Sequence, residues 1–536
     1  MMRCSLRRLF IVVFACFCGT LIILALPRAG FDREWESKPA GSVEVERPAA
    51  RRFLAESPAP IAALKGLGDQ RSLPHQPRPP SLTDDHLGVD PFDFVGSSNK
   101  MVLAKLARHL KAVDYASMIP QECPDNLTLA AHWRRTRRKH VSRADIWERF
   151  YSDIGSCDVW RDEELVSELL HDLSTLPIKD VHIMDGGTQV KLVFTYENDK
   201  QAVFKPMRFG RDYESDPNHF YFSDFERHQA EIATFHLDKI LGYRRAVPTV
   251  GRIVNITSDL FEHAEKKLKK TFFVSPAKNH CFVSRCDYYC DTTHAICGLP
   301  DLKEGSVQVF LPDEAAVPRK HNRSPYRRTY SKKNQVAAWQ ANMNYCNAEV
   351  KTNKKYAHGR RLLDLIDLHI MDFLIGNQDR HHYESFVVFE GIPSYAVHLD
   401  NGRAFGRTDF DDLDILLPLK QCCLIRPSTL QKLVEFYKKP KSLVKTLHES
   451  MSKDPVHPIL AYKHYAAVDR RLSIVMEAIA GCLDSFGAAE VVVPMYHNPA
   501  VPAPLGPEME YRSDEESETD PKKTVDNNNN KKEKTN

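Results

Sequence analysis

Residues 375 to 384 read Ile375-Gly-Asn-Gln-Asp379-Arg-His-His-Tyr-Glu384. They follow the apolar-rich segment 362–375, whose composition and closing glycine predict a buried helix. Two short runs of strand-forming residues come next, at 386–389 and 395–399, and the second leads into Asp400-Asn-Gly-Arg. This order predicts a loop and a strand end that bring two aspartates to one site.

The spacing of these acidic residues indicates phosphoryl transfer. Protein kinases place a metal-binding Asn five residues after the catalytic Asp, and a second metal-binding Asp further along the chain. Here Glu384 is the fifth residue after Asp379, and Asp400 follows Asp379 by 21 residues. We expect Asp379 to orient an acceptor hydroxyl and take its proton, Asp400 to hold a metal at the phosphates, and Glu384 to face metal or nucleotide. The alternative for Asp379 is a structural ion pair with Arg380.

A lysine and two glutamates upstream extend the same arrangement. Alternating apolar residues predict a hairpin that ends at Lys205, followed by a helix over 224–241 that is opened by Glu226 and Glu231. We expect Lys205 to meet the phosphates and Glu226 to pair with it, and Glu231 is the rival partner. Alternatively, Ser223-x-x-Glu226 is a capping box, in which case Glu226 only caps the helix.

Several features of ordinary kinases are missing. The chain has no G-x-G-x-x-G loop, no V-A-I-K and no H-R-D, and Gly186-Gly-Thr-Gln189 is at most a shortened phosphate-facing loop. An ordinary cytosolic protein kinase is therefore excluded. The Asp-Arg-His order also occurs in lipid kinases, so the residues leave the acceptor open. The additional carboxylate suits a hard divalent ion such as Mn²⁺ or Mg²⁺.

The ends of the chain point to the secretory pathway. A basic start precedes an apolar run that ends at residue 26, which predicts a signal peptide or signal anchor over 1–26. The other predicted parts are a proline-rich stem (27–98), a catalytic domain (99–505) whose smaller lobe ends near 307 and whose larger lobe starts near 312, and a disordered tail (506–536). The membrane is contacted only through the first segment, if it is uncleaved. The net charge of +3 gives no reason to expect nucleic acid as a partner.

The cysteines agree with an oxidising compartment. Ten lie beyond the apolar run, and an even number predicts five disulfides. Four of them, Cys281, Cys286, Cys290 and Cys297, have an alternative interpretation as a zinc cluster. Asn126-Leu-Thr and Asn255-Ile-Thr are glycosylation sequons.

Four motifs resemble one known group, the "family with sequence similarity 20" of secretory-pathway kinases. The stretch 375–384 is the most specific of them, and the others are His398-Leu-Asp400-Asn-Gly-Arg, Phe204-Lys205-Pro and Phe225-Glu226-Arg-His. The resemblance covers roughly residues 120 to 490. It implies an α+β, atypical two-lobed protein-kinase-like fold stapled by disulfides, with ATP and Mn²⁺ as cofactors and Mg²⁺ as a possible substitute.

The resemblance also implies roles for individual residues. Asp379 becomes the catalytic residue, and Glu226 and Asp400 become metal ligands. Contacts to ATP are implied for Gln189, Lys205, Glu384 and Asp400, and for the backbone of Gln308, Val309, Phe310 and Leu311 at the adenine. The implied disulfides are Cys281–Cys297, Cys286–Cys290, Cys346–Cys422 and Cys423–Cys482, which leaves Cys123–Cys157 as the fifth and replaces the zinc interpretation.

The family contains a casein kinase that acts on Ser-x-Glu, a xylose kinase that acts on proteoglycan linkers, and a pseudokinase. The stretches 219–226 and 286–290 look more like the casein kinase, whereas the Glu-Ser-Phe ending after Tyr383 is shared with the xylose kinase. We therefore expect a serine/threonine protein kinase of the Golgi lumen that is also secreted and acts on acidic secreted proteins. The alternatives are a glycan kinase and a non-catalytic activating partner. A pseudokinase or a second copy of the chain is a possible partner.

Overall fold

The computed structural model describes residues 92, 100–136, 145–184, 186–217, 220–329, 336–389, 394–438 and 440–503. The predicted signal segment, the tail and all of the stem except Phe92 lie outside these residues. No described helix is long and apolar enough to cross a membrane.

The described residues form helices and strands that together make an α+β fold. The helices are α2 (Lys100–Leu110), α3 (Tyr115–Met118), α4 (Leu129–Thr136), α5 (Ile146–Asp153), α6 (Glu163–Thr175), α7 (His228–Leu241), α8 (Lys266–Lys269), α9 (Ala338–Ala341), α10 (Arg361–Ile375), α11 (Leu417–Cys422), α12 (Pro427–Tyr437), α13 (Leu443–Met451), α14 (Tyr462–Phe486) and α15 (Ala488–Val491). The strands are β1 (Ile178–Ile183), β2 (Leu192–Tyr196), β3 (Gln201–Pro206), β4 (Thr249–Asn255), β5 (Phe272–Val274), β6 (His280–Phe282), β7 (Ile296–Cys297), β8 (Leu302–Val309), β9 (Arg319–Arg323), β10 (His358–Gly359), β11 (His382–Phe386) and β12 (Tyr496–His497).

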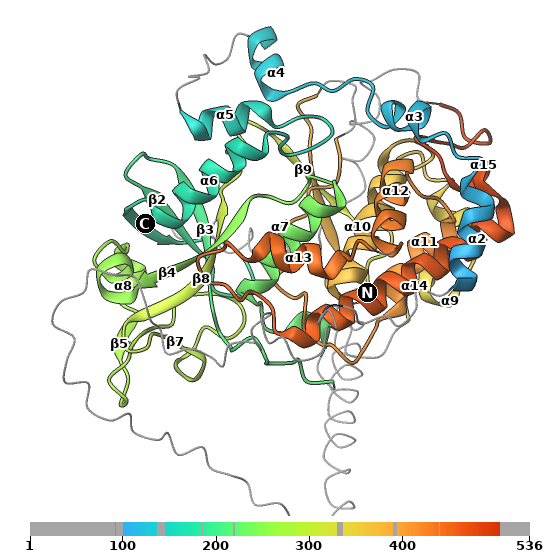
Figure 1. Cartoon of the computed structure of the whole chain (residues 1–536). Coiled ribbons are helices and arrows are strands. Elements are labelled where there is room, and N and C mark those ends of the chain that lie inside the picture. The colour runs from blue at the N-terminus through green and yellow to red at the C-terminus, as the bar shows by residue number, and fades with distance from the viewer. Residues whose placement is uncertain are drawn as a thin grey trace, which may run out of the picture. The chain divides into compact units, whose positions relative to one another are not determined.

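A five-stranded sheet organises the first half of the described chain. Its order is β1-β2-β3-β8-β4, and every neighbouring pair is antiparallel. The β2–β3 hairpin, which was predicted from alternating apolar residues, is confirmed. Its second strand carries Lys205 opposite Ser306 of β8. Helices α6 and α7 pack against the sheet, as Figure 1 shows. This sheet therefore fixes where the Lys205 side chain begins.

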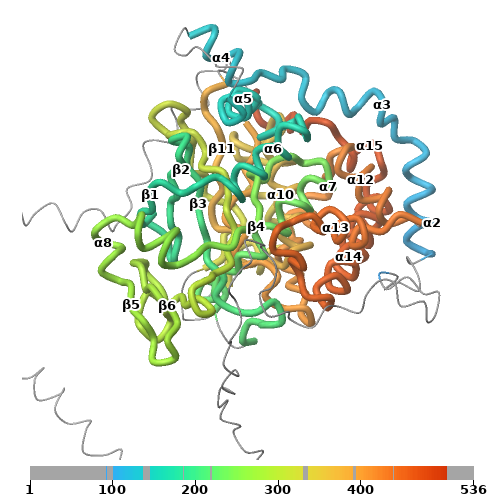
Figure 2. The backbone as a smooth tube through the Cα atoms, turned by 60° about the vertical axis from the view of Figure 1, so that its left-hand side comes forward, coloured from blue at the N-terminus to red at the C-terminus, as the bar shows by residue number. Residues whose placement is uncertain are grey.

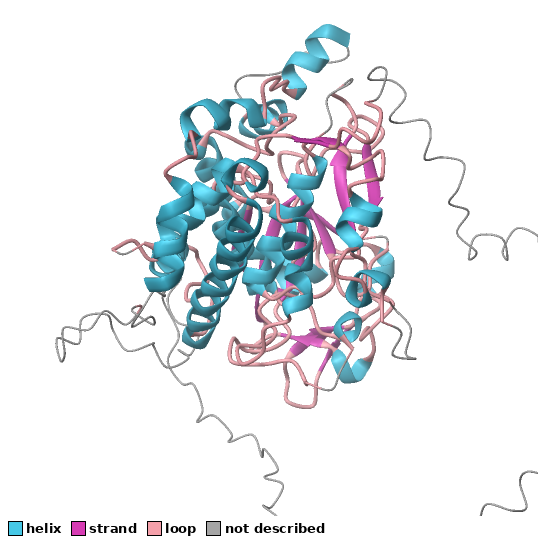
Figure 3. Cartoon of the chain, turned by 90° about the vertical axis from the view of Figure 1, so that its right-hand side faces the viewer, coloured by secondary structure: helices cyan, strands magenta, loops and turns pink. Residues whose placement is uncertain are grey.

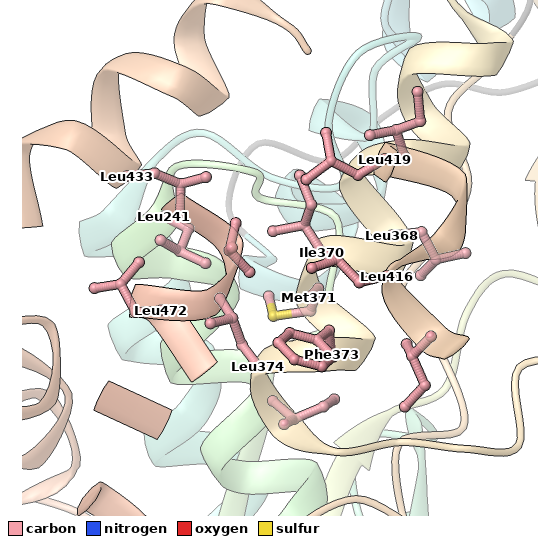
Figure 4. Close-up of a cluster of buried hydrophobic side chains, with 14 of the residues drawn as sticks. Leu241, Leu368, Ile370, Met371, Phe373, Leu374, Leu416, Leu419, Leu433 and Leu472 are labelled. Atoms are coloured by element: carbon pink, nitrogen blue, oxygen red, sulfur yellow. The ribbon is translucent and has the colours of Figure 1, made fainter. Parts of the chain in front are cut away.

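A helical core makes up most of the second half. Helix α10 is buried along its whole length and packs against α11 and α14. Figure 4 shows Leu368, Met371 and Phe373 of α10 among leucines from the surrounding helices. The helix ends where Gly376 adopts a left-handed φ of 71°, which glycine reaches without steric cost. The chain then turns into the loop that holds Asp379.

Two hydrophobic clusters correspond to these two halves, and α7 contributes to both. Phe235 belongs to the cluster built on the sheet, whereas Ile232 and Leu237 belong to the helical cluster. Figures 2 and 3 show the strands and the long helices on different sides of the described chain. Residues near the start of α7 thus lie at the junction of the two halves.

Three local predictions differ from the structure. Helix α7 begins at His228. Residues 224–227, which were predicted to be part of this helix, therefore lie outside it. Strand β11 (His382–Phe386) begins inside the segment that was predicted to be a loop, because it pairs with β9. Residues 395–399 form only isolated bridges, at Val397 and His398, instead of a strand.

The structure joins the cysteines into the same five pairs that were expected: Cys123–Cys157, Cys281–Cys297, Cys286–Cys290, Cys346–Cys422 and Cys423–Cys482. Two of the bonds tie α11 and the residue after it to their neighbours. The zinc interpretation is therefore wrong, because its four thiols are used in disulfides. Asn126 is exposed, whereas the Asn255 side chain accepts hydrogen bonds from Thr257 and Ser258, and glycosylation of both stays a prediction.

Candidate active site

Lys205 lies at the centre of a group of carboxylates. Its Nζ is 2.5 Å from Glu231 Oε1, 3.1 Å from Glu226 Oε2 and 3.6 Å from Asp400 Oδ1. The lysine is buried, with 7% of its surface exposed. Carboxylates from two distant segments of the chain therefore meet at the ammonium group of Lys205. Glu226 and Glu231 were alternative candidates for the partner of Lys205, and both carboxylates contact it.

Glu226 precedes its helix and does not cap it. The N-cap of α7 is Arg227, and the cap makes no side-chain hydrogen bond, so the capping-box interpretation is wrong. Instead, Gln189 fixes this segment: its Nε2 donates to the Asp224 carbonyl at 2.6 Å, and its Oε1 accepts from the Glu226 N–H at 3.0 Å. Gln189 therefore orients Glu226 toward Lys205 through the backbone.

Asp400 reaches the cluster from the other half of the fold. Its Oδ1 is 3.0 Å from Lys191 Nζ, and its side chain is 74% exposed, whereas that of Lys191 is 12% exposed. The backbone of Asp400 has a φ of 53°, an uncommon conformation for a residue other than glycine. Such outliers occur at functional sites where the surrounding structure holds them in place. The exposed carboxylate is thus held near two lysines with one face open to a ligand.

Neighbouring charges in this cluster shift the pKa values of Lys205, Glu226 and Asp400. Burial lowers the pKa of Lys205, but the attraction of Glu226, Glu231 and Asp400 outweighs this effect and raises the pKa above the ordinary value. Burial raises the pKa of Glu226, but Lys191 and Lys205 bring it down to about 2. Lys191 is the main cause of a lowered pKa at Asp400, with Lys205 assisting. Lys205, Glu226 and Asp400 are therefore charged at neutral pH.

Arg403 is the partner of Asp379. Its Nη1 contacts Asp379 Oδ2, its Nη2 donates to Thr188 Oγ1 at 3.0 Å, and its Nε donates to the Asp224 carbonyl at 3.2 Å. The Asp379 side chain is 8% exposed and also lies 3.4 Å from His381 Nδ1. The Arg403 guanidinium thus connects Asp379, the predicted catalytic residue, to the segment 186–189 and to the residues before α7.

Arg380 has a structural role away from Asp379. Its guanidinium donates to both oxygens of Asp372 at 2.9 Å and to Asn401 Oδ1 at 2.7 Å. The predicted alternative, an ion pair between Asp379 and Arg380, is therefore not the one the structure contains. Arg380 instead holds the residue after Asp400 against the end of α10.

Two carboxylates fit a divalent metal. Glu226 and Asp400 both lie within 4 Å of Lys205 Nζ and of Lys191 Nζ. Glu226 Oε2 is buried and accepts no well-aligned hydrogen bond from a described residue. Among the described residues, no group of three or more ligating side chains is arranged to hold a metal. This donor set matches Mg²⁺-like ions, which use one or two carboxylates together with phosphate oxygens.

The predicted adenine-contacting backbone lies at the end of β8. The N–H groups of Val309 and Phe310 donate to the carbonyls of Pro248 and Gln201, and the Phe310 carbonyl accepts from Tyr151. The Leu311 N–H makes no hydrogen bond to a described residue. Leu311 thus has a backbone donor that remains for a ligand.

The side-chain contacts of Glu384 that the structure describes are with β9, not with the residues around Lys205. It sits on β11, where its Oε2 accepts from Arg319 Nε at 2.9 Å, and its side chain is 23% exposed. A contact between Glu384 and nucleotide stays a prediction.

The residues that the sequence reasoning missed are Lys191, Thr188 and Arg403, whose roles depend on contacts between distant segments. Only the position of Arg403 directly after the Asp400-Asn-Gly motif was a signal that could have found it.

Comparisons with known proteins give the context of this geometry. The profile of the family described as "Golgi casein kinase, C-terminal, Fam20" matches residues 145–491. A Caenorhabditis elegans protein, "Extracellular serine/threonine protein kinase CeFam20", is 65% identical over 500 residues, which are 93% of this chain and 95% of that protein. Human glycosaminoglycan xylosylkinase is 41% identical over 61% of this chain and 77% of its own length.

A solved structure matches as well. The "crystal structure of the Golgi casein kinase with Mn/ADP bound" superimposes with a TM-score of 0.74 at 70% identity, and the match covers 80% of this chain and all of that one. The likeness confirms the predicted α+β, two-lobed and disulfide-stapled fold.

Proposed function

The chain belongs to the Fam20 family of Golgi casein kinases, and from this premise we propose that it transfers the γ-phosphate of ATP to serine in Ser-x-Glu motifs of secreted proteins. The observation that carries the proposal is the meeting of Lys205, Glu226, Glu231 and Asp400. Phosphoryl transfer needs a cation on the phosphates and carboxylates that hold a metal, and this cluster contains both.

The residues divide the work of transfer. Lys205 and Lys191 bind phosphate oxygens, and the Leu311 N–H binds adenine. Glu226 and Asp400 hold Mn²⁺ or Mg²⁺, which neutralises phosphate charge when it is bound. The printed title of a crystal structure 70% identical to this chain names Mn and ADP, which supports this assignment.

Asp379 acts on the acceptor. It accepts a hydrogen bond from the serine hydroxyl and takes its proton as the oxygen forms a bond to the γ-phosphorus. The bond from that phosphorus to the β–γ bridging oxygen breaks, and ADP leaves. Arg403 holds the Asp379 carboxylate in position during this step. Glu231 keeps Lys205 charged and directed into the site, because its own carboxylate is buried beside the ammonium.

A second candidate is a glycan kinase, favoured by the 41% identity to the human xylosylkinase. It would use the same donor site with a sugar hydroxyl as the acceptor. A third is a non-catalytic protein that activates a related kinase. The catalytic proposal is favoured over the third because Lys205, Glu226 and Asp400 are all retained and in contact.

The test is phosphate transfer measured side by side. The full-length secreted protein is incubated with Mn²⁺, labelled ATP and either casein or a xylosylated linker, with Asp379→Asn as the control. We expect label on casein, little on the linker and none with the variant. Transfer to the linker alone would identify a glycan kinase. No transfer to either, with biological activity kept in Asp379→Asn, would identify a non-catalytic partner.

The compartment follows from the same relationship. The C. elegans relative is named an extracellular kinase, and the five disulfides fit an oxidising environment. We propose that the protein works in the Golgi lumen and outside the cell. Detection of the phosphorylating activity in conditioned medium, and its absence from cytosol, tests this location.

A further inference from the structure

The loop that the Cys286–Cys290 disulfide closes contains two tyrosines in different surroundings. Tyr288 is 43% exposed, whereas Tyr289 is partly buried. The backbone of Tyr289 has a φ of 64°, which is uncommon for a residue other than glycine and persists only where the surrounding structure holds it. The disulfide joins residues that are only four positions apart in the sequence, so it restricts the conformations of the loop. Tyr289 is therefore held firmly in place.

Tyr289 contacts the segment that carries Glu226. Its hydroxyl donates to the Ser223 carbonyl at 2.6 Å, and its ring centroid lies 4.2 Å from that of Phe225. Arg208 supports both rings: its Nη2 donates to the Tyr289 carbonyl at 3.3 Å, and its Cζ lies 5.8 Å from the centroid of the Phe225 ring. The side chain of Tyr289 thus contacts the residues three positions and one position before Glu226.

The segment depends on such contacts because α7 does not hold it. Glu226 precedes the helix, and the N-cap of α7 makes no side-chain hydrogen bond. Gln189 binds the Asp224 carbonyl and the Glu226 N–H, and Tyr289 binds the Ser223 carbonyl. Two side chains from distant parts of the sequence therefore set the course of the backbone that leads to the Glu226 carboxylate.

The same loop also supports the segment that contains Gln189. The Tyr288 N–H donates to the Thr188 carbonyl at 2.8 Å, and Thr188 directly precedes Gln189. The Thr188 hydroxyl in turn accepts a hydrogen bond from Arg403. The disulfide-closed loop is therefore in contact with both segments that fix Glu226.

We propose that Tyr289 is a positioning residue that directs Glu226 toward a bound divalent metal. This inference rests on the proposed function, which makes Glu226 and Asp400 the ligands of that metal. The two carboxylates come from different halves of the fold, so the ion is bound tightly only if the Glu226 backbone is held at the right distance from Asp400. Tyr289 acts through Ser223 and Phe225, in the way that groups behind the ligands of a metal orient those ligands.

The test measures binding without catalysis. Calorimetry gives the affinity of the full-length protein for ADP, once with excess Mn²⁺ and once with EDTA, and the ratio of the two affinities is the contribution of the metal. The variants are Tyr289→Phe, which removes only the hydroxyl, and Tyr289→Leu, which also removes the ring. Tyr288→Phe is the matched control, because Tyr288 lies in the same loop and is exposed.

We expect Tyr289→Phe to weaken ADP binding about tenfold in Mn²⁺, the loss that follows when one hydrogen bond behind a metal ligand is removed. Its ADP binding in EDTA should equal that of wild type, because the lysines at the phosphates are unchanged. Tyr289→Leu should lose more in Mn²⁺, and Tyr288→Phe should match wild type in both solutions. A misfolded variant would bind ADP poorly in EDTA as well, so this measurement separates positioning from misfolding.

Three results would overturn the proposal. They are equal ADP affinity of wild type and Tyr289→Phe in Mn²⁺, an equal loss with and without the metal, and the same loss in Tyr288→Phe. Failure of the kinase function gives a different pattern: wild type transfers no phosphate to casein, yet Mn²⁺ strengthens its ADP binding and Tyr289→Phe reduces this gain. If the kinase function stands, Tyr289→Phe raises the KM for ATP at limiting Mn²⁺ and leaves the KM for casein unchanged.

Discussion

Replacement of Lys205 by Met should destabilise the fold as well as abolish activity. The lysine neutralises Glu226 and Glu231, whose side chains are 14% and 1% exposed. A pKa of about 2 for Glu226, against an ordinary 4.5, corresponds to about 3 kcal/mol of folding free energy at neutral pH. Lys191 supplies part of this, but Glu231 also loses its ion pair. We therefore expect a net loss of about 2 to 4 kcal/mol.

The effect should depend on pH. A carboxylate with a lowered pKa stabilises the fold above its ordinary pKa, and this stabilisation is lost as the pH falls toward the folded value, here about 2 for Glu226. In Lys205→Met, burial is less opposed and the pKa of Glu226 rises again. The difference in unfolding free energy between wild type and variant should therefore be largest near pH 7 and shrink as the pH falls below about 4.5.

Urea unfolding at several pH values, with disulfides intact, measures this difference. Lys179→Met is the matched control, because Lys179 forms an ion pair with Asp199 at 2.6 Å on the open surface. Its unfolding midpoint should stay at the wild-type value. If Lys205→Met unfolds at the same urea concentration as the control, or loses the same stability at pH 7 and pH 3, Lys205 does not stabilise the fold through Glu226.

Three further substitutions test the site. Asp379→Asn should lower kcat by about two to four orders of magnitude and leave Mn²⁺-dependent ADP binding intact, which steady-state kinetics and calorimetry check together. Gly402→Ala should weaken that ADP binding about tenfold, because its Cβ would lie 3.0 Å from Glu226, whereas Gly481→Ala, with nothing within 4 Å, should bind ADP normally. Arg403→Gln should lower kcat about tenfold or more with an unchanged KM for ATP, and an unaltered kcat would remove it from the mechanism.

The sequence was informative where function depends on short local patterns. The hairpin before Lys205 follows from alternation of apolar residues, and the glycine after α10 marks the helix end that leads to Asp379. The order of Lys205, Glu226 and Asp400 was enough to predict that these residues meet, because phosphoryl transfer needs few parts. A site that they share with Asp379 stays a prediction.

The remaining features depend on long-range contacts that no local pattern encodes. Asp224 to Arg227 stay outside α7 because Gln189 and Gly402 hydrogen-bond to their backbone. Arg403 pairs with Asp379, although Arg380 is its neighbour, because Arg380 is already bound to Asp372. Strand β11 appears in a polar segment because β9 pairs with it across more than fifty residues of chain.

We propose that one metal joins the two halves of the fold at Glu226 and Asp400. A crystal grown with Mn²⁺ and ADP, with data collected near the manganese absorption edge, tests it directly. We expect an anomalous peak bonded to carboxylate oxygens of both residues, with Lys205 on the phosphates of ADP. A peak that lies away from both carboxylates, or ADP bound without contact to Lys205, would contradict it.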